Sequence, residues 1–275
     1  MAEFSFEFFP PRTDKGLQNL INVAKKYEAL NPSYYSVTFG AGATSQDKTL
    51  DTIKALADNV NVALVPHISC VYATQQSTDN LLKIYKDLGI KKLLVLRGDL
   101  PPSESLGQFQ HAIDLLRYIK DNYANDFALE VAAYPEYHPQ STSAKQDFKF
   151  FKDKVDAGAC GAVTQYFYNF ESFEHFHRAC IDYDITIPIT PGIMPIYDVQ
   201  QLERFSNRCG ADLPRWLSKE LLSFGDDKEA MIEHGAKVVA ELCKKVLELG
   251  VPGIHFYTLN RYDAIAEIYD LLRSP

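Results

Sequence analysis

The chain has 275 residues, of which 46% are hydrophobic and 23% charged, so it can bury a full core. Its net charge of −8 and pI near 5.4 argue against nucleic acid or an anionic membrane as the main partner. The sequence has no apolar run near the ~20 residues of a membrane span and no signal-peptide pattern at its N-terminus. The five cysteines lack CxxC spacing, which is typical of free thiols in a reducing cytoplasm.

Strand-like and helix-like segments alternate along the whole chain. It opens on an aromatic-rich strand that begins at Phe4 and is stopped by Pro10 and Pro11. The seventh strand is the least regular, because Pro188 and Pro191 fit a central strand poorly. Strands after the first are predicted at residues 34–39, 63–70, 92–99, 128–135, 162–168, 185–194 and 253–260. Helices are predicted at residues 16–30, 46–59, 75–88, 106–122, 143–157, 171–183, 199–209, 228–249 and 262–272.

Eight strands, each followed by a helix, within about 250 residues predict a (β/α)8 TIM barrel. We expect a single domain over residues 1–275. A doubly wound sheet is the alternative fold, but it would usually carry a glycine fingerprint after its first strand, and Phe-Phe-Pro-Pro is not one. In a barrel, the C-terminal ends of the strands and the loops after them form the active site.

Glu7 lies inside the opening strand with phenylalanines on both sides. An ionised carboxylate is costly to remove from water unless it is paired. Apolar surroundings favour the protonated carboxyl that a general acid needs. The opening strand alone does not distinguish this hypothesis from a Glu7 that simply points outward from an edge strand.

A polar or charged side chain ends every predicted strand except the seventh. Alone, His67 would more often be a satisfied core histidine, and Arg97 with Asp99 a surface ion pair worth little. Converging on one barrel mouth, such groups are expensive to bury without a ligand. The set comprises Glu7, Thr38, His67, Arg97 with Asp99, Tyr134 with His138, Gln165, and Asn260 with Arg261.

Several chemistries lack their motifs in this sequence. It has no G-x-S-x-G elbow, no H-E-x-x-H motif, no Walker lysine loop and no cluster at metal-ligand spacing, so we expect no metal site. The carboxyl groups, arginine, amides and aromatics that remain suit a large, flat ligand with polar edges. Such a ligand would be held by stacking and hydrogen bonds, with proton transfer nearby.

Eight motifs, in order along essentially the whole chain, resemble those of the methylenetetrahydrofolate reductase family. Any one would be a weak indication, whereas eight in sequence are specific. The resemblance is to the short bacterial type and implies a flavin-dependent barrel without a regulatory domain. The motifs are Phe6–Arg12, Ser36–Thr38, Pro66–His67, Leu96–Asp99, Ala132–Glu136, Thr164–Gln165, Pro191–Pro195 and His255–Arg261.

The resemblance implies that NADH or NADPH reduces bound FAD, and that 5,10-methylenetetrahydrofolate then takes the hydride to become 5-methyltetrahydrofolate. Glu7 matches the family's general acid, which would open the folate ring by protonation on its N10 side. Asp99 matches an aspartate between flavin and pterin, whose charge would stabilise the cationic folate. The implied protein is a cytoplasmic oxidoreductase of one-carbon metabolism and methionine biosynthesis, and its relatives lead us to expect a homo-oligomer.

The same matching assigns residues to the two ligands. Phe205 by itself would be interpreted as a core aromatic, and only the resemblance makes it a substrate residue. FAD would be held by Thr38, His67, Arg97, Gly98, Asp99, His111, Ala112, Tyr134, His138, Asp147 and Lys154. The folate side would comprise Gln165, Gln201, Phe205 and Arg261.

Three residues toward the adenosine end of the FAD site depart from the family pattern. They are His111, where some relatives have tyrosine, Phe150, where some have asparagine, and Asp153, where some have arginine. The departures concern the affinity for FAD rather than the catalytic groups.

Three other functions stay open. One is a reductase of the same family that lacks flavin or takes electrons from a partner protein. Another is an unrelated barrel lyase, although the run Asn260–Tyr262 does not supply the phosphate-binding loop such an enzyme would need. The third is a non-catalytic scaffold, which the intact Glu7 and Asp99 argue against. Fold alone would not separate these functions.

Overall fold

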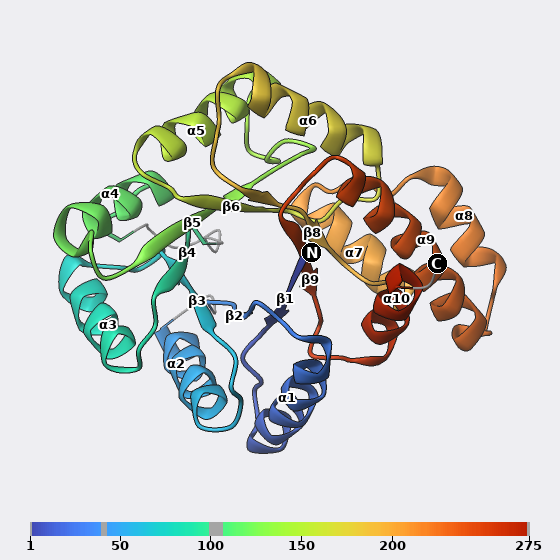
Figure 1. The fold of residues 1–275 in the computed structure, drawn as a ribbon, viewed down its shortest axis with the longest axis horizontal. Coiled ribbons are helices and arrows are strands. Elements are labelled where there is room, and N and C mark those ends of the chain that lie inside the picture. The colour runs from blue at the N-terminus through green and yellow to red at the C-terminus, as the bar shows by residue number, and fades with distance from the viewer. Residues whose placement is uncertain (1, 40–42, 99–106, 274–275) are drawn as a thin grey trace.

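The computed structural model describes residues 2–39, 43–98 and 107–273, which form one barrel of parallel strands inside a ring of helices (Figure 1). The strands are β1 (Glu3–Phe8), β2 (Tyr34–Val37), β3 (Leu64–Ser69), β4 (Lys92–Leu96), β5 (Ala128–Ala133), β6 (Gly161–Thr164), β7 (Ile189–Thr190), β8 (Gly192–Ile193) and β9 (Gly253–Tyr257). The helices are α1 (Asp14–Tyr27), α2 (Ala43–Ala57), α3 (Gln75–Asp87), α4 (Ala112–Tyr123), α5 (Ala144–Asp156), α6 (Phe170–Asp182), α7 (Val199–Cys209), α8 (Arg215–Ser223), α9 (Lys228–Glu248) and α10 (Asp263–Arg273).

The barrel closes through a seventh strand that is split in two. The sheet order is β7-β6-β5-β4-β3-β2-β1-β9-β8 and every pairing is parallel. Only Pro191 separates β7 from β8, and it has no N–H to donate to a ladder. Its carbonyl accepts a hydrogen bond from the His255 N–H at 2.9 Å. The predicted (β/α)8 barrel is therefore confirmed, with two short strands where one was expected.

Other differences lie where strands give way to loops. The fourth strand ends at Leu96 rather than residue 99, and the sixth ends at Thr164 rather than residue 168. Gly98 has a φ of +85°, which an extended strand does not allow. Helix α8 was not predicted, and it lies between α7 and α9 before the chain returns to β9.

Side chains alternate between two apolar layers. On β1, Phe6 and Phe8 face the helices, where the Phe6 ring stacks on Tyr27 of α1 with centroids 4.3 Å apart. A smaller cluster of Tyr34, Val65, Leu94 and Val163 is separate from this main core. Because successive strand residues point to opposite faces, Ser5 and Glu7 face the barrel interior.

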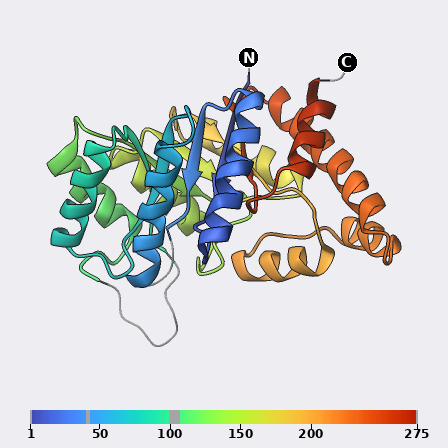
Figure 2. The same cartoon turned by 90° about the horizontal axis from the view of Figure 1, so that it is seen from below.

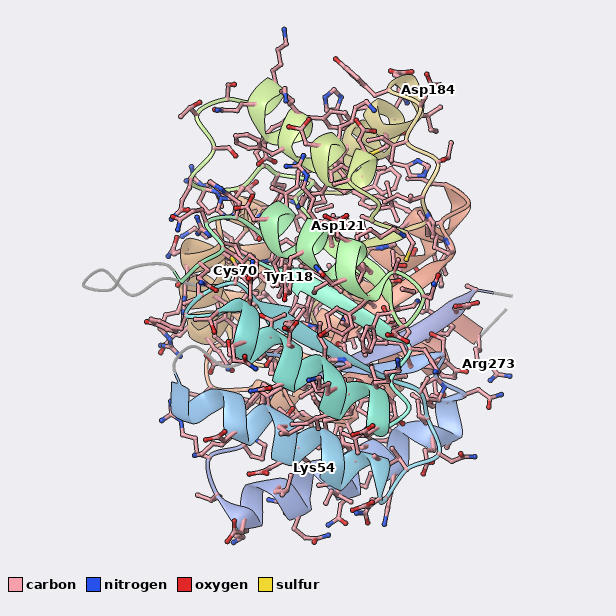
Figure 3. All side chains as sticks on the ribbon, turned by 90° about the vertical axis from the view of Figure 1, so that its left-hand side faces the viewer. Lys54, Cys70, Tyr118, Asp121, Asp184 and Arg273 are labelled. Carbon is pink, nitrogen blue, oxygen red and sulfur yellow. The ribbon has the colours of Figure 1, made fainter. Side chains whose placement is uncertain are left out.

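An ion pair joins β4 to β5, and helices cover the flank of the barrel. The Lys92 ammonium lies 2.8 Å from the Glu130 carboxylate, which is largely buried. Figure 3 shows α2, α3 and α4 side by side on the outside, where the Tyr118 hydroxyl of α4 donates to Asp79 of α3 at 2.7 Å. Figure 2 shows α7 at the side of the barrel opposite the two termini. Among the described residues, no helix is long and apolar enough to cross a membrane.

The structure predicts different outcomes for two phenylalanines, Phe6 within β1 and Phe9 just after it. Phe6 is fully buried, whereas Phe9 is 44% exposed. We expect Phe6→Ala to lower the free energy of unfolding by about 3–5 kcal/mol, because it leaves a cavity between β1 and α1. Phe9→Ala, the matched control, should cost less than about 1 kcal/mol. Urea denaturation measures both, and equal losses would contradict the assignment of faces.

Candidate active site

The Glu7 carboxyl lies inside the barrel near the C-terminal end of β1, with its side chain only 15% exposed. Its Oε2 atom is 3.3 Å from Nε2 of His67 on β3 and 3.6 Å from Nε2 of His255 on β9. The expectation that phenylalanines surround this carboxyl is wrong, because Phe6 and Phe8 lie on the other face of the strand. The alternative in which Glu7 points outward from an edge strand is excluded as well.

His255 connects Glu7 to two serines. The imidazole is fully buried, with Nδ1 2.7 Å from the Ser5 hydroxyl and Nε2 3.3 Å from the Ser36 hydroxyl. The Tyr34 ring stacks on it with centroids 5.7 Å apart. Sequence reasoning gave Ser5, Ser36 and His255 no role of their own. The alternation that places Glu7 inward also places Ser5 inward, and Ser5 is paired in register with His255.

His67 is a neutral group at physiological pH. Burial lowers the pKa of His67 to about 4, the nearby Glu7 carboxylate opposes this shift, and His255 adds to it. The contact between His67 and Glu7 is therefore no ion pair in the resting protein. Nε2 of His67 also has no well-oriented hydrogen-bond partner among the described residues. A buried polar atom of this kind beside a carboxyl suits a polar ligand at the barrel mouth.

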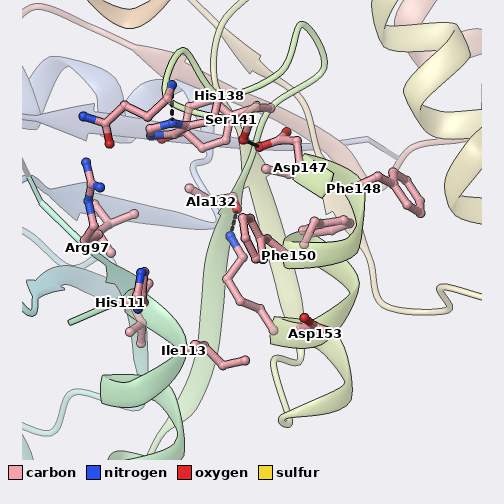
Figure 4. Close-up of a pocket in the computed structure, with 18 of the residues that line it drawn as sticks. Arg97, His111, Ile113, Ala132, His138, Ser141, Asp147, Phe148, Phe150 and Asp153 are labelled. Carbon is pink, nitrogen blue, oxygen red and sulfur yellow. Dashed lines mark hydrogen bonds between the residues drawn. The ribbon is translucent and has the colours of Figure 1, made fainter. Parts of the chain in front are cut away.

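A pocket of about 640 Å³ lies beside β4 and β5, between α4 and α5 (Figure 4). Thr38 and His67 do not line it, and Asp99 lies outside the described residues. The backbone of Thr38 holds the mouth together, because its N–H donates to the Phe8 carbonyl and its carbonyl accepts from Thr49. The predicted cofactor residues that line the pocket are Arg97, Gly98, His111, Ala112, Tyr134, His138, Asp147 and Lys154.

One part of the pocket is rich in charged and hydrogen-bonding groups. The Lys154 ammonium donates to the Ala132 carbonyl at 2.6 Å, and the Ser141 hydroxyl donates to Asp147 at 2.5 Å. Desolvation lowers the pKa of Lys154 to about 8, although the Asp147 carboxylate opposes the shift. A partly buried cation on the pocket wall would be stabilised by an anionic ligand.

Gly98 allows the backbone at the pocket edge to lie close to the Ser69 side chain. A Cβ atom there would lie 2.0 Å from the Ser69 hydroxyl, and its φ of +85° is unfavourable for other residues. The side chain of His138 is fixed nearby, with its ring 4.7 Å from that of Tyr134 and Nδ1 accepting from the Gln140 N–H at 3.1 Å.

The predicted folate residues come from three other elements. Gln165 directly follows β6, and its Oε1 accepts from the Tyr166 N–H at 3.0 Å. Gln201 and Phe205 are one turn apart on α7 and both partly buried. The Arg261 guanidinium, in the loop after β9, lies 3.9 Å from the centroid of the Tyr197 ring.

Both polar atoms of the Asn260 side chain form hydrogen bonds with the protein backbone. Its side-chain oxygen accepts from the Phe9 N–H at 3.0 Å, and its amide nitrogen donates to the Phe9 carbonyl at 2.8 Å. These two bonds join the chain after β9 to the chain after β1, directly beyond Glu7.

Glu136 is a further acidic residue to which sequence reasoning gave no role. Its Oε2 accepts from the backbone N–H of Asp212 at 2.7 Å, which connects the loop after β5 to the segment after α7. Burial raises the pKa of Glu136 to about 7; the Asp212 N–H opposes this shift and the Asp212 carboxylate adds to it. Among the described residues, His, Cys, Asp and Glu form no group that could hold a metal ion.

The fold and site together define a barrel protein with a carboxyl in its mouth and a large ligand pocket beside it. A family model described as methylenetetrahydrofolate reductase matches residues 1–273. The chain therefore belongs to the methylenetetrahydrofolate reductase family, an enzyme family of oxidoreductases.

Individual relatives agree with the family assignment. The protein named 5,10-methylenetetrahydrofolate reductase in Escherichia coli is 37% identical over 257 residues, covering 94% of this chain and 86% of that protein. A Zea mays protein named methylenetetrahydrofolate reductase (NADH) 1 is 35% identical, covering 94% of this chain and 46% of that protein.

A solved structure shows the same fold. It is an uncharacterized protein from Clostridium thermocellum that binds two copies of 5-methyl-5,6,7,8-tetrahydrofolic acid. It superposes with a TM-score of 0.67 at 17% identity, covering 99% of this chain and 94% of that one.

The raised pKa of Glu136 predicts how its contribution to stability depends on pH. The folded protein binds this proton more tightly than the unfolded chain, so the contribution is complete below the unfolded pKa and is lost as the pH rises to about 7. Urea denaturation should show the stability of the wild type relative to Glu136→Gln falling between about pH 5 and 7 and levelling above.

Glu136→Gln is a suitable reference because glutamine can still accept from the Asp212 N–H. His67 is present in both proteins, so its own contribution to stability cancels in the difference between them. That contribution rises with pH below about pH 6.5, opposite to the change expected for Glu136. A difference in stability that does not change with pH would contradict the prediction.

Proposed function

We propose that this enzyme reduces 5,10-methylenetetrahydrofolate to 5-methyltetrahydrofolate, with NADH or NADPH as the electron donor and FAD in the pocket between α4 and α5. The observation that carries the proposal is the Glu7 carboxyl inside the barrel mouth of a chain that belongs to this family. The name of the maize relative favours NADH as the donor.

The residues of the pocket fit a flavin dinucleotide. The Lys154 ammonium and the Arg97 guanidinium suit a pyrophosphate, and the Asp147 carboxylate suits ribose hydroxyls. Gly98 lets the backbone at the pocket edge pack closely against Ser69 of β3. A bound flavin would supply the hydride carrier between nicotinamide and folate.

Glu7 is the proton donor in this proposal. It would transfer a proton to the N10 side of the folate, which opens the five-membered ring and leaves a cation that accepts hydride. His255 and its two serines would fix the carboxyl in place, while the neutral His67 adds no competing positive charge beside the cationic folate. Asp99 would stabilise that cation, and Gln165, Gln201, Phe205 and Arg261 would hold the folate.

The absorbance spectrum of the purified protein tests the cofactor. We expect visible flavin bands that bleach when NADH is added without oxygen and return when methylenetetrahydrofolate is added. Recovery would report both half-reactions in one cuvette. A colourless protein that FAD does not reconstitute would overturn the flavin mechanism, and a yellow protein that NADH cannot bleach would point to another electron donor.

Replacing Glu7 separates proton donation from cofactor reduction. Glu7→Gln should slow the folate half-reaction by about 10²–10⁴-fold, because the carboxamide cannot donate the proton. Stopped-flow reduction of the flavin by NADH should stay close to the wild-type rate. Glu3→Gln, an exposed residue on the same strand, is the control and should change neither rate. Equal loss of both half-reactions would contradict the role of Glu7 as the acid.

A reductase of this family that works without bound flavin is the second candidate. It is favoured by His111 and Asp153, which depart from the family pattern and both line the pocket. Asp153 is also occupied by an ion pair with Lys149 at 2.7 Å. In that case NADH itself would deliver hydride to the folate, and Glu7 would keep its role.

A further inference from the structure

The pocket has an apolar wall as well as its polar one. Figure 4 shows His138, Ser141 and Asp147 toward one end of the pocket and Ile113 and Asp153 toward the other. The apolar residues that line it are Ile113 of α4, Phe148, Phe150 and Phe151 of α5, and Phe176 of α6. A ligand that fills the pocket would meet both charged groups and apolar ring surface.

Phe150 is exposed where its neighbour is not. Phe151 is only 4% exposed and packs with Phe148 and Phe176, whereas Phe150 is 51% exposed. Single exposed aromatics are common on protein surfaces and need no explanation. Phe150 differs because it lines a large pocket whose opposite wall carries the exposed side chain of His111. A planar ligand would cover the face of a ring that the protein leaves open.

The topology decides which end of a ligand could reach Phe150. Glu7 is on β1, and β2, β3 and β4 separate it from β5 around the barrel. Phe150 is on α5, in the outer layer of helices beyond β5. The reacting ring must lie at the mouth near Glu7, so the part of the ligand beside Phe150 is remote from the chemistry.

We propose that Phe150 is the stacking platform for the adenine base of the dinucleotide. The inference rests on the proposed function, because it takes the ligand to be FAD. This chain would hold the base by ring stacking, and Phe150 would set the preference for FAD over shorter flavins. Base–aromatic stacking tolerates a half-exposed site, because every base presents a flat face.

Comparing two flavins isolates the contribution of Phe150. Phe150→Ala should weaken FAD binding roughly 5- to 100-fold, as judged by quenching of flavin fluorescence. FMN lacks the adenine, so its affinity should stay within about twofold of the wild type on the same reasoning. Unchanged FAD affinity, or an equal loss for FAD and FMN, would overturn the proposal.

Two conservative variants distinguish stacking from plain apolar contact. Phe150→Trp keeps a ring and should retain FAD affinity, whereas Phe150→Leu keeps apolar surface without a ring and should lose most of what Phe150→Ala loses. A Phe150→Leu variant that binds FAD like the wild type would overturn stacking. Ile181→Ala removes another exposed apolar side chain, 63% exposed on α6 and outside the pocket, and is the control for binding and for melting temperature.

Failure of the flavin proposal is distinguishable from failure of this one. If the wild type binds neither FAD nor FMN, the flavin mechanism fails, and calorimetry with ADP as the probe then decides the role of Phe150. Weaker ADP binding by Phe150→Ala would support an adenine platform. ADP binding that is absent, or that the variant leaves unchanged, would overturn it.

Discussion

Placing the Glu7 carboxyl inside the barrel requires polar partners, because a carboxylate removed from water is costly unless it is paired or hydrogen-bonded. The barrel places two imidazoles beside it, with Nε2 of His67 on β3 at 3.3 Å and Nε2 of His255 on β9 at 3.6 Å from its Oε2 atom. His255 is in turn held by the serines of β1 and β2. His255 and the two serines form one hydrogen-bonded cluster beside Glu7, whereas the phenylalanines of β1 pack against the helices.

The same need for hydrogen-bond partners explains how the mouth is held together. Asn260 substitutes for a strand ladder where β1 gives way to prolines, and Glu136 attaches the segment after α7 to the loop after β5. These contacts join chain segments that are distant in sequence. They tie together the chain segments that follow β1, β5, α7 and β9.

Much of the fold and of the pocket could be predicted from the sequence, because barrel strands carry local signals. Alternation of apolar and polar residues, turn residues and helical spacing located all eight strand positions, including the split one, where Pro191 already weakened the pattern. The helix α8 was missed, because a short amphipathic segment after Pro214 resembles loop sequence. Eight of the eleven residues matched to the cofactor line one pocket. Most lie at the ends of adjacent strands or the starts of the following helices, which are neighbours in a barrel, whereas Lys154 reaches the pocket from the last turn of α5.

The amino-acid sequence by itself determined the class of fold, the strand ends that face the mouth and the family, since these depend on local patterns and motif order. Only the tertiary structure decided what surrounds Glu7. Neighbours along a strand point to opposite faces, so the phenylalanines beside Glu7 in sequence are not beside it in space. His67 and His255 reach it from strands about 60 and 250 residues away, through a register that no local pattern encodes.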